Sequence, residues 1–332
     1  MDYHIPVMPK ETVDALAIRP SGIYVDCTLG SGGHSGIILK KLNKNGRLIG
    51  IDQDIDAIKE ATKRLEIEAV HDTFHNFTQI MNDKNIAHVD GVLIDLGVSS
   101  HQLDTAERGF SYRLSGALDM RMNQESDTKT AADIVNTYSE EQLVDILFSF
   151  GEERFSRRIA KAIVTERVDN PIVTTQHLSD IIKKATPYQK PGMSHPAMRS
   201  FMALRIAVNN ELNPLDEVLT QIIDHLSIGG RICVLTFHSL EDRIVKKCFN
   251  RLVSPCICPR EIPYCVCNKL PQLRVITKKP ILPSQDELKY NNRAHSAKLR
   301  VGEKIDANWA TPSKTGTKDK TIFKKTTKSI KP

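Results

Sequence analysis

The residues best suited to bind a nucleotide-like ligand lie near the N-terminus. A run of strand-forming apolar residues at 23–27 is followed by LGSGGHSG at 29–36, a helical apolar face at 37–42 and a second apolar strand at 47–51. A glycine-rich turn between a strand and a helix lets such a ligand lie against the backbone amides at the helix start. Asp52 follows the second strand and is placed to hydrogen-bond a ribose. The stretch predicts a site for a dinucleotide or for S-adenosylmethionine (SAM).

Charge distinguishes these two ligands. NAD carries a pyrophosphate, which carboxylates around the turn would disfavour, whereas SAM carries a sulfonium and an ammonium. Asp26 closes the first strand and is expected to point into the site. The turn also lacks the third glycine of GxGxxG, because Ser35 occupies that position. SAM is therefore favoured over NAD, and a glycine turn without a ligand is the structural alternative.

A second group of polar residues follows the apolar strand at 91–96. Ligands of open α/β sheets bind beyond the carboxyl ends of the strands, so side chains here should face cofactor and substrate. Asp95 could accept a hydrogen bond from an amine, and Ser99 and Ser100 could accept one from a base. Gln102 should face the same site. The alternative is a polar loop in which a serine only caps the next helix.

The segment FHSLEDR at 237–243 also follows a strand and contains a histidine, a serine and two acids. Such a set suggests a hydrolase. However, neighbouring residues of one turn cannot line up as nucleophile, base and orienting acid, and the chain has no GxSxG sequence. Hydrolysis is therefore disfavoured, and Phe237 and His238 are expected to position the substrate.

Basic residues gather in two places. One helix face carries Arg154, Arg157, Arg158 and Lys161, and a second group comprises Lys246, Lys247 and Arg251. Basic clusters beside a cleft suit phosphate contacts. The alternative is a solvated helix face, because several glutamates lie nearby in the sequence.

Four cysteines lie close together at positions 256, 258, 265 and 267, between prolines that stiffen the loop. Cys256, Cys258, Cys265 and Cys267 could hold a structural zinc tetrahedrally. Disulfides are disfavoured in a reducing cytosol. The C-x-C spacing is less usual than C-x2-C, so the zinc site and a loop without metal both stay open.

The first hundred residues must provide the sheet that positions these groups. Strands expected at 23–27, 47–51, 68–71 and 91–96 alternate with helices, which predicts a doubly wound α/β sheet. Phe74 and Phe77 follow the third strand, where an adenine ring would need an apolar neighbour.

The pattern changes at about residue 108. Helices are expected at 135–150, 152–166 and 175–185, and strand signals are absent up to about 213. A helix at 215–226, a turn at Gly229 and Gly230 and a strand at 231–236 then resume the sheet. Runs at 273–277 and 296–301 could form a closing antiparallel hairpin. The sequence thus predicts a helical domain inserted into a sheet domain.

Composition suggests a cytoplasmic protein. The chain has 332 residues and 40% hydrophobic content, with no apolar run long enough to span a bilayer and no signal-peptide pattern at its start. The net charge of +6 is concentrated in residues 303–332, where eight lysines face three acids. This tail is expected to be disordered and solvated.

Several long segments together resemble the RsmH (MraW) family of bacterial 16S ribosomal RNA methyltransferases. They include HIPVMPKE, VDCTLGSGGHSG, IDQD, DGVLIDLGVSSHQLDTAERGFSYR, ALDMRM, HPAMRSFMALRIAVNNEL, GGRICVLTFHSLEDR and NNRAHSAKLR. The first begins at residue 4 and the last ends at about residue 301, a span that is nearly the whole folded region. The resemblance implies a Rossmann-like class I SAM-dependent methyltransferase sheet with an inserted all-helical domain. Together with the patterns above, it gives boundaries of 1–107 and 214–302 for the core, 108–213 for the insertion and 303–332 for the tail. The Cys-rich loop at 255–268 is a feature of this sequence that the resemblance does not imply for every family member.

The resemblance also implies a reaction, which is methyl transfer from SAM to the exocyclic N4 of a cytidine in the decoding centre of 16S rRNA. The substrate would be the assembled small ribosomal subunit, and a homodimer stays open. The implied SAM contacts are Gly32, Gly33, His34, Asp52, Phe77, Asp95 and Gln102. Expected substrate contacts are Phe110, Arg154, Arg157, Arg158, Arg199, Phe237 and His238.

One departure concerns the loop after Asp95. Many methyltransferases that act on amino groups of bases carry Pro-Pro and an aromatic residue there, whereas this chain has Leu96-Gly97-Val98. An aromatic platform must therefore come from elsewhere, such as Phe110, Tyr112 or Phe237. Two other functions stay open, a non-catalytic ribosome assembly factor that retains a SAM fold and a NAD-dependent oxidoreductase.

Overall fold

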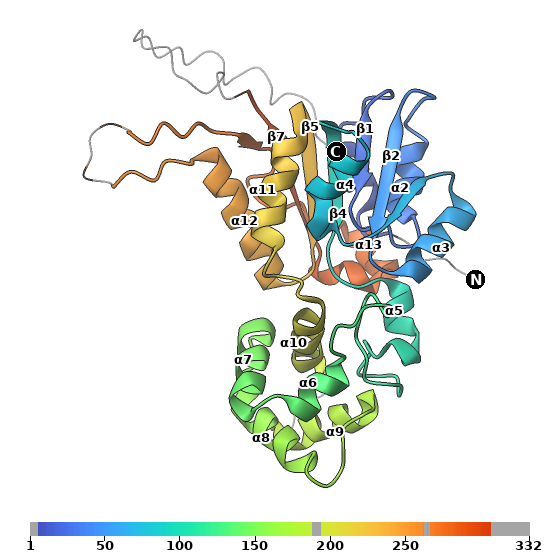
Figure 1. Ribbon diagram of the computed structural model, residues 1–332, viewed down its shortest axis with the longest axis vertical. Coiled ribbons are helices and arrows are strands. Elements are labelled where there is room, and N and C mark those ends of the chain that lie inside the picture. Colours follow the sequence, from blue (N-terminus) through green and yellow to red (C-terminus); the bar gives the residue numbers. More distant parts are fainter. Residues whose placement is uncertain (1–5, 188–193, 260, 262–263, 265, 307–332) are drawn as a thin grey trace.

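The computed structural model describes residues 6–187, 194–259, 261, 264 and 266–306. A sheet with flanking helices forms one end of the molecule, and a bundle of helices forms the other (Figure 1). The lysine-rich tail predicted to be disordered lies outside the described residues from position 307 onward. None of the helices in the described part of the chain combines the length and apolar character that a membrane crossing needs.

The sheet contains seven strands within the described residues, in the order β3-β2-β1-β4-β5-β7-β6. The first five strands in this order pair in parallel, whereas β7 is antiparallel to both β5 and β6. This doubly wound arrangement confirms the predicted fold class. The strands are β1 Ile23–Asp26, β2 Arg47–Asp52, β3 Glu68–His71, β4 Val89–Asp95, β5 Leu226–Thr236, β6 Leu273–Val275 and β7 Lys298–Lys304.

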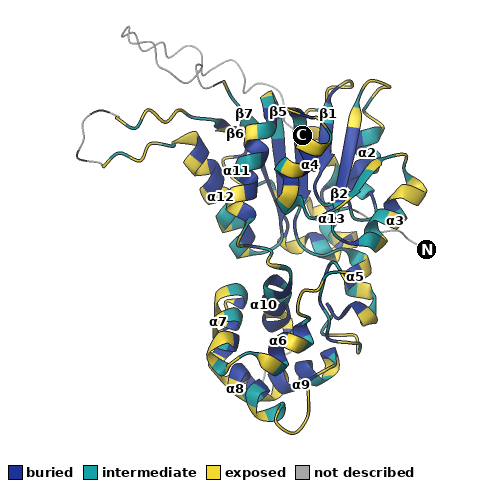
Figure 2. Cartoon of the chain, viewed as in Figure 1, coloured by how far each residue is buried: buried dark blue, intermediate teal, exposed yellow. Residues whose placement is uncertain are grey.

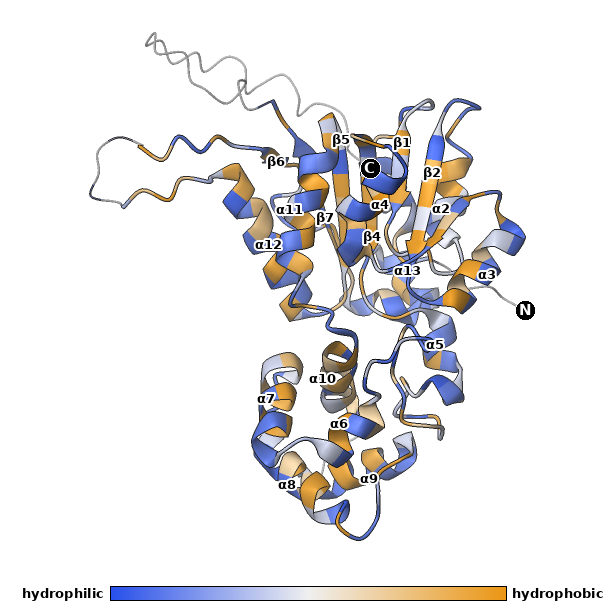
Figure 3. Ribbon diagram, in the orientation of Figure 1, coloured by the Kyte–Doolittle hydropathy of each residue, from blue (hydrophilic) through white to orange (hydrophobic). Residues whose placement is uncertain are grey.

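Alternating side chains of the strands build two hydrophobic clusters, one on each face of the sheet. In β4, Val92 and Ile94 join the cluster beneath α4, α11 and α12, whereas Leu93 joins the cluster beneath α1 and α2. Figure 2 shows the central strands β1, β2 and β4 as mainly buried, whereas β3 at the edge has no buried residue. Figure 3 shows β1 and most of β2 as apolar. The helices around the sheet are α1 Pro9–Ala15, α2 Gly33–Leu39, α3 Ile55–Arg64, α4 Phe77–Asp83, α5 Ser100–Asp104, α11 Leu215–His225, α12 Ser239–Val253 and α13 Gln285–Tyr290.

The helical region has a hydrophobic cluster of its own, formed by residues between Phe110 and Val208. This cluster falls inside the insertion predicted at 108–213, whose boundaries stay predictions. Its helices are α6 Ala131–Thr137, α7 Glu140–Gly151, α8 Ser156–Glu166, α9 Thr175–Ala185 and α10 Met198–Asn209.

Two local predictions were wrong. The single helix expected at 135–150 is two helices, because Ser139 leaves the helical conformation and caps α7 through a capping box with Gln142. The turn expected at Gly229 and Gly230 is instead part of the long strand β5. Gly229 adopts φ 79°, and the β4–β5 register shifts nearby, so these glycines allow an irregularity within the strand.

Candidate active site

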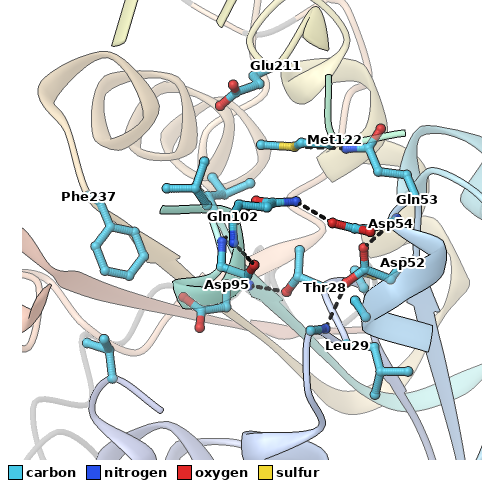
Figure 4. A pocket seen from close by; sticks show the side chains of 18 of the residues that line it. Thr28, Leu29, Asp52, Gln53, Asp54, Asp95, Gln102, Met122, Glu211 and Phe237 are labelled. Atoms are coloured by element: carbon cyan, nitrogen blue, oxygen red, sulfur yellow. Dashed lines mark hydrogen bonds between the residues drawn. The ribbon is translucent and has the colours of Figure 1, made fainter. Parts of the chain in front are cut away.

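A cavity of about 350 Å³ lies where the sheet meets the helical region (Figure 4). The carboxyl ends of β1, β2, β4 and β5 all contribute to its wall, which is where ligands bind in doubly wound sheets. From the helical side, Met122 and the end of α10 complete the wall. A volume of this size is within the roughly 300–1,000 Å³ typical of small-molecule sites.

The glycine-rich turn forms one side of the cavity. Gly30 adopts φ 52°, and its amide donates a hydrogen bond of 2.7 Å to Asp52 Oδ2, which joins the turn to the end of β2. Gly33 and His34 also line the cavity. Gly32 does not line it; with φ 82° it begins α2, and a Cβ there would lie 2.5 Å from Leu65 Cδ1. Gly32 is therefore needed for the backbone and for packing rather than for direct contact.

Asp52 faces the cavity from the end of β2, as the sequence predicts. Its Oδ1 accepts a hydrogen bond of 2.9 Å from the Asp54 amide. Burial raises the pKa of Asp52 to about 6. The carboxylate keeps lone pairs for a further donor, because each oxygen can accept two hydrogen bonds.

Asp26 does not point into the cavity, contrary to the sequence-based expectation. It is buried, and it accepts hydrogen bonds from Ser35 Oγ at 2.7 Å and from the Thr28 amide at 3.2 Å. Ser35, the residue that replaces the third glycine, is thus the partner that holds this carboxyl group beneath the turn. Burial raises the pKa of Asp26 to about 7.

Asp95 ends β4 at the centre of the site. Its amide donates to Thr28 Oγ1 at 2.7 Å, and its Oδ2 lies 3.6 Å from His34 Nδ1. Its Oδ1 is buried and has no hydrogen-bond partner among the described residues. Burial, with the charges of Asp26 and Glu241, raises the pKa of Asp95 well above its usual value. Buried acceptors of this kind are normally paired, so a ligand or a water in the cavity is expected to donate to it.

Residues after Asp95 serve mainly to hold the site together. The hydroxyl of Ser99 accepts a hydrogen bond in a capping box with Gln102 at the start of α5. This is the alternative predicted for the loop, in which a serine caps the next helix. Gln102 also donates from Nε2 to Asp54 Oδ2 at 2.8 Å, and Arg108 Nη1 donates to the same oxygen at 2.8 Å. Ser99 and Gln102 line the cavity, whereas Ser100 does not.

Of the two phenylalanines after β3, only Phe74 lines the cavity. Phe77 is fully buried in the cluster beneath α11, because it begins α4 and faces the sheet. Of the two, Phe74 is therefore the residue that a ligand in this cavity could touch.

Among the expected substrate contacts, Phe237 alone lines the cavity. Phe110 is buried in the helical cluster, and His238 caps α12. The arginines Arg154, Arg157, Arg158 and Arg199 are exposed and lie outside the cavity wall. Helix α8 lies at the end of the molecule that is farther from the sheet, so its arginines could contact only a large substrate (Figure 1).

Several polar residues of the cavity wall were not predicted, among them one group from α10, the turn after it and α12. Arg205, in α10, binds Glu211 through two hydrogen bonds of 2.9 and 2.8 Å, and Asn209 and Glu241 lie in the same wall. Arg205, Asn209 and Glu211 belong to HPAMRSFMALRIAVNNEL, and Glu241 belongs to FHSLEDR, so the segments that carry the resemblance contained the signal. Spacing alone could not show that α10 turns this face toward the sheet.

The wall carries an excess of acids. Five carboxyl groups and two arginines line the cavity. The acids are Asp52, Asp54, Asp95, Glu211 and Glu241, and the arginines are Arg205 and Arg293. Such a site favours a cationic ligand and disfavours a pyrophosphate. In Figure 4, Asp95 lies between Phe237 on one side and Asp52 and Asp54 on the other. The cavity can thus place a cation and a planar group on either side of one carboxyl group.

Comparison with known proteins agrees with this geometry. The sequence model of the MraW methylase family matches residues 1–305 of this chain. A protein of Clostridium botulinum called ribosomal RNA small subunit methyltransferase H is 52% identical over 91% of this chain and 99% of its own length. A protein of the same name from Fusobacterium nucleatum is 51% identical over 92% of this chain and 98% of its own length. One from Clostridioides difficile is 48% identical over 91% of this chain and 99% of its own length.

Proposed function

Because this chain belongs to the MraW methylase family, we propose that it methylates the exocyclic N4 of a cytidine in 16S rRNA, using SAM. The names of its relatives support ribosomal RNA of the small subunit as the substrate. The N4 atom, the decoding centre and the assembled subunit as substrate follow from the family resemblance. The observation that supports amine methylation most directly is the unpartnered Oδ1 of Asp95 at the cavity wall.

The residues around the cavity fit SAM. Asp52 would hold the ribose hydroxyls, and Phe74 would lie against the adenine. The backbone of Gly30, Gly33 and His34 would approach the ligand closely, because the two glycines have no Cβ and Gly30 adopts a φ that favours glycine. The acidic wall suits the sulfonium and ammonium groups, and this charge argues against NAD.

Bound SAM supplies an electrophilic methyl group. The protein would contribute mainly proximity and orientation, which can account for much of the reduction in the barrier. Asp95 would accept a hydrogen bond from the N4 amine and so hold the nitrogen lone pair toward the methyl group. Its carboxylate is also placed to take the proton that the amine loses.

The target base would enter from the side of Phe237. Phe237 is the one aromatic candidate for the platform that lines the cavity, and it replaces the aromatic residue missing after Asp95. A base in folded RNA must be presented or flipped out of its stack to reach Asp95 inside the cavity. The exposed arginines of α8 and Arg199 would contact phosphates at a distance from the reacting atoms.

The test is methyl transfer from isotopically labelled SAM to small ribosomal subunits that lack the modification, followed by mass analysis of the nucleosides. Label in N4-methylated cytidine is the expected result. Label in another nucleoside would refute the N4 assignment and keep the methyltransferase. No label, together with tight binding to the subunit, would favour a non-catalytic assembly factor.

A further inference from the structure

A long loop connects helix α12 to the edge strand β6. Residues 254–271, here called the arm, connect the end of α12 to β6, and Figure 1 shows the described parts of this stretch extending away from the body of the protein. The Gln272 amide donates to the Leu252 carbonyl at 2.9 Å and closes the base of the arm. None of the described residues of the arm belongs to a helix or a strand.

The arm has no hydrophobic core to order it. Every described residue of the arm is exposed or half-buried, as the colours of Figure 2 show. Three of its large apolar residues are largely exposed. Ile257 is 68% exposed, Tyr264 72% and Val266 57%. Loops longer than about 12–15 residues without secondary structure are uncommon in compact domains. A constraint other than burial is therefore needed to hold the two limbs of the arm together.

Three cysteine sulfurs meet in the arm. The Sγ atoms of Cys256, Cys258 and Cys267 all lie within 4.8 Å of one another. Four thiolates around a zinc ion at about 2.3 Å would be roughly 3.8 Å apart, so a contraction of about 1 Å is enough to bring these three into a metal's coordination shell. Cys256 and Cys258 lie on the outgoing limb and Cys267 on the returning limb, so a shared ion would join the limbs.

The chemistry of the donors selects the metal. The group contains sulfur ligands alone, with no carboxylate or imidazole among the described residues that form it. Thiolates select zinc, copper(I) or iron–sulfur centres and disfavour magnesium and calcium. Structural zinc sites with cysteine ligands are common in short loops that lack a core of their own. Cys265, the fourth cysteine of the sequence pattern, lies outside the described residues.

We infer that Cys256, Cys258 and Cys267 bind a structural zinc ion that ties the limbs of the arm together. The site is separate from methyl transfer, because none of the arm's described residues lines the active-site cavity. Zinc would order the arm and contribute no group to the reaction. This inference does not depend on which base the enzyme methylates.

The experiment uses the full chain, purified under reducing conditions from cells supplied with zinc and then dialysed. Metal analysis by mass spectrometry should find about one zinc per chain in the wild type. The double variant Cys256→Ser/Cys267→Ser should retain roughly tenfold less. Cys248→Ser is the matched control, because Cys248 is buried in α12 away from the arm and its polar neighbours Thr220 and Asp216 accommodate a hydroxyl. The control should keep the zinc.

Cobalt provides a second measurement on the wild type, which does not rely on any variant folding. Co²⁺ added to the metal-free chain should produce the thiolate charge-transfer absorption of tetrahedral sulfur coordination, and zinc should displace it. Protease cleavage within the arm should become roughly tenfold faster when the metal is removed. Zinc that persists in the double variant, a wild type that binds neither metal, or arm cysteines that form a disulfide under these conditions would overturn the inference.

Discussion

Asp95→Asn tests the proposed mechanism with the least change in shape. The substitution keeps the volume of the side chain and the backbone hydrogen bond to Thr28, but it replaces one carboxylate oxygen with an amide. The variant loses the negative charge that the N4 amine would meet. Asp90→Asn is the matched control, because Asp90 lies in the same strand but outside the cavity wall.

The magnitude follows from the contact that is lost. A hydrogen bond to a charged group contributes about 1.5–3 kcal/mol. If that contact forms fully in the transition state, the rate constant for methyl transfer should fall roughly 10- to 150-fold. SAM affinity should change less, because the acidic wall keeps its other carboxyl groups.

The pH dependence adds an independent signature. Burial raises the pKa of Asp95, so the carboxyl group is protonated at a pH where an exposed aspartate would be ionised. Only the ionised form can accept both the hydrogen bond and the proton of the amine. The single-turnover rate at saturating SAM should therefore rise with pH up to the raised pKa and level off above it. In Asp95→Asn this rise should be absent.

The assay is single-turnover transfer from labelled SAM to unmodified small subunits, from pH 5.5 to pH 9, with SAM affinity measured by calorimetry on the same preparations. A near-normal rate for Asp95→Asn would refute the role of Asp95. So would a loss of rate that disappears at saturating SAM, since it would assign Asp95 to cofactor binding alone. A comparable loss in Asp90→Asn would show that the effect is structural.

Three further predictions concern the framework of the site. Because burial raises the pKa of Asp26 from 3.8 to about 7, the folded state holds a proton that the unfolded state releases, and the free energy of unfolding should fall by roughly 4 kcal/mol as the pH rises from about 4 to above 7. Asp26→Asn should reduce the fall in stability over this pH range by about that amount in denaturant titrations, and the fall that is left belongs to Asp52 and Asp95, whose pKa values burial also raises. An unchanged slope would contradict the assignment. Phe74→Ala should weaken SAM binding about tenfold in calorimetry with little loss of stability. Phe77→Ala should instead lower the free energy of unfolding by about 3–5 kcal/mol. The reverse pattern would restore Phe77 as the cofactor contact. Arg108→Met should cost about 3–5 kcal/mol in urea unfolding, because it leaves Asp54 buried and without its cationic partner, and Asp54→Asn in the same chain should recover part of that loss. No recovery in the double variant would show that packing rather than charge explains the cost.

Local sequence was enough to determine the architecture. Strand, glycine turn and helix signals depend on neighbours in the chain, and they predicted β1, β2, β3 and β4 close to their observed bounds. The loss of strand signals after residue 108 correctly indicated a helical region. Asp52 and Asp95 were identified as site residues for the same reason, since the end of a parallel strand is a defined place in a doubly wound sheet.

Tertiary structure alone decided which side chains face the cavity. Phe74 and Phe77 both follow β3 closely in the chain. Phe77, in α4, packs into the hydrophobic cluster on the sheet, whereas Phe74 precedes that helix and lines the cavity. The sequence could not show that Asp95 lines the cavity whereas Asp26 does not, because that difference depends on the hydrogen bond that Ser35 donates to Asp26. Arg205 and Glu211 lie more than a hundred residues after Asp95 and reach the site because α10 packs against its edge. Side-chain direction and distant contacts depend on packing between elements, which the local pattern of residues does not encode.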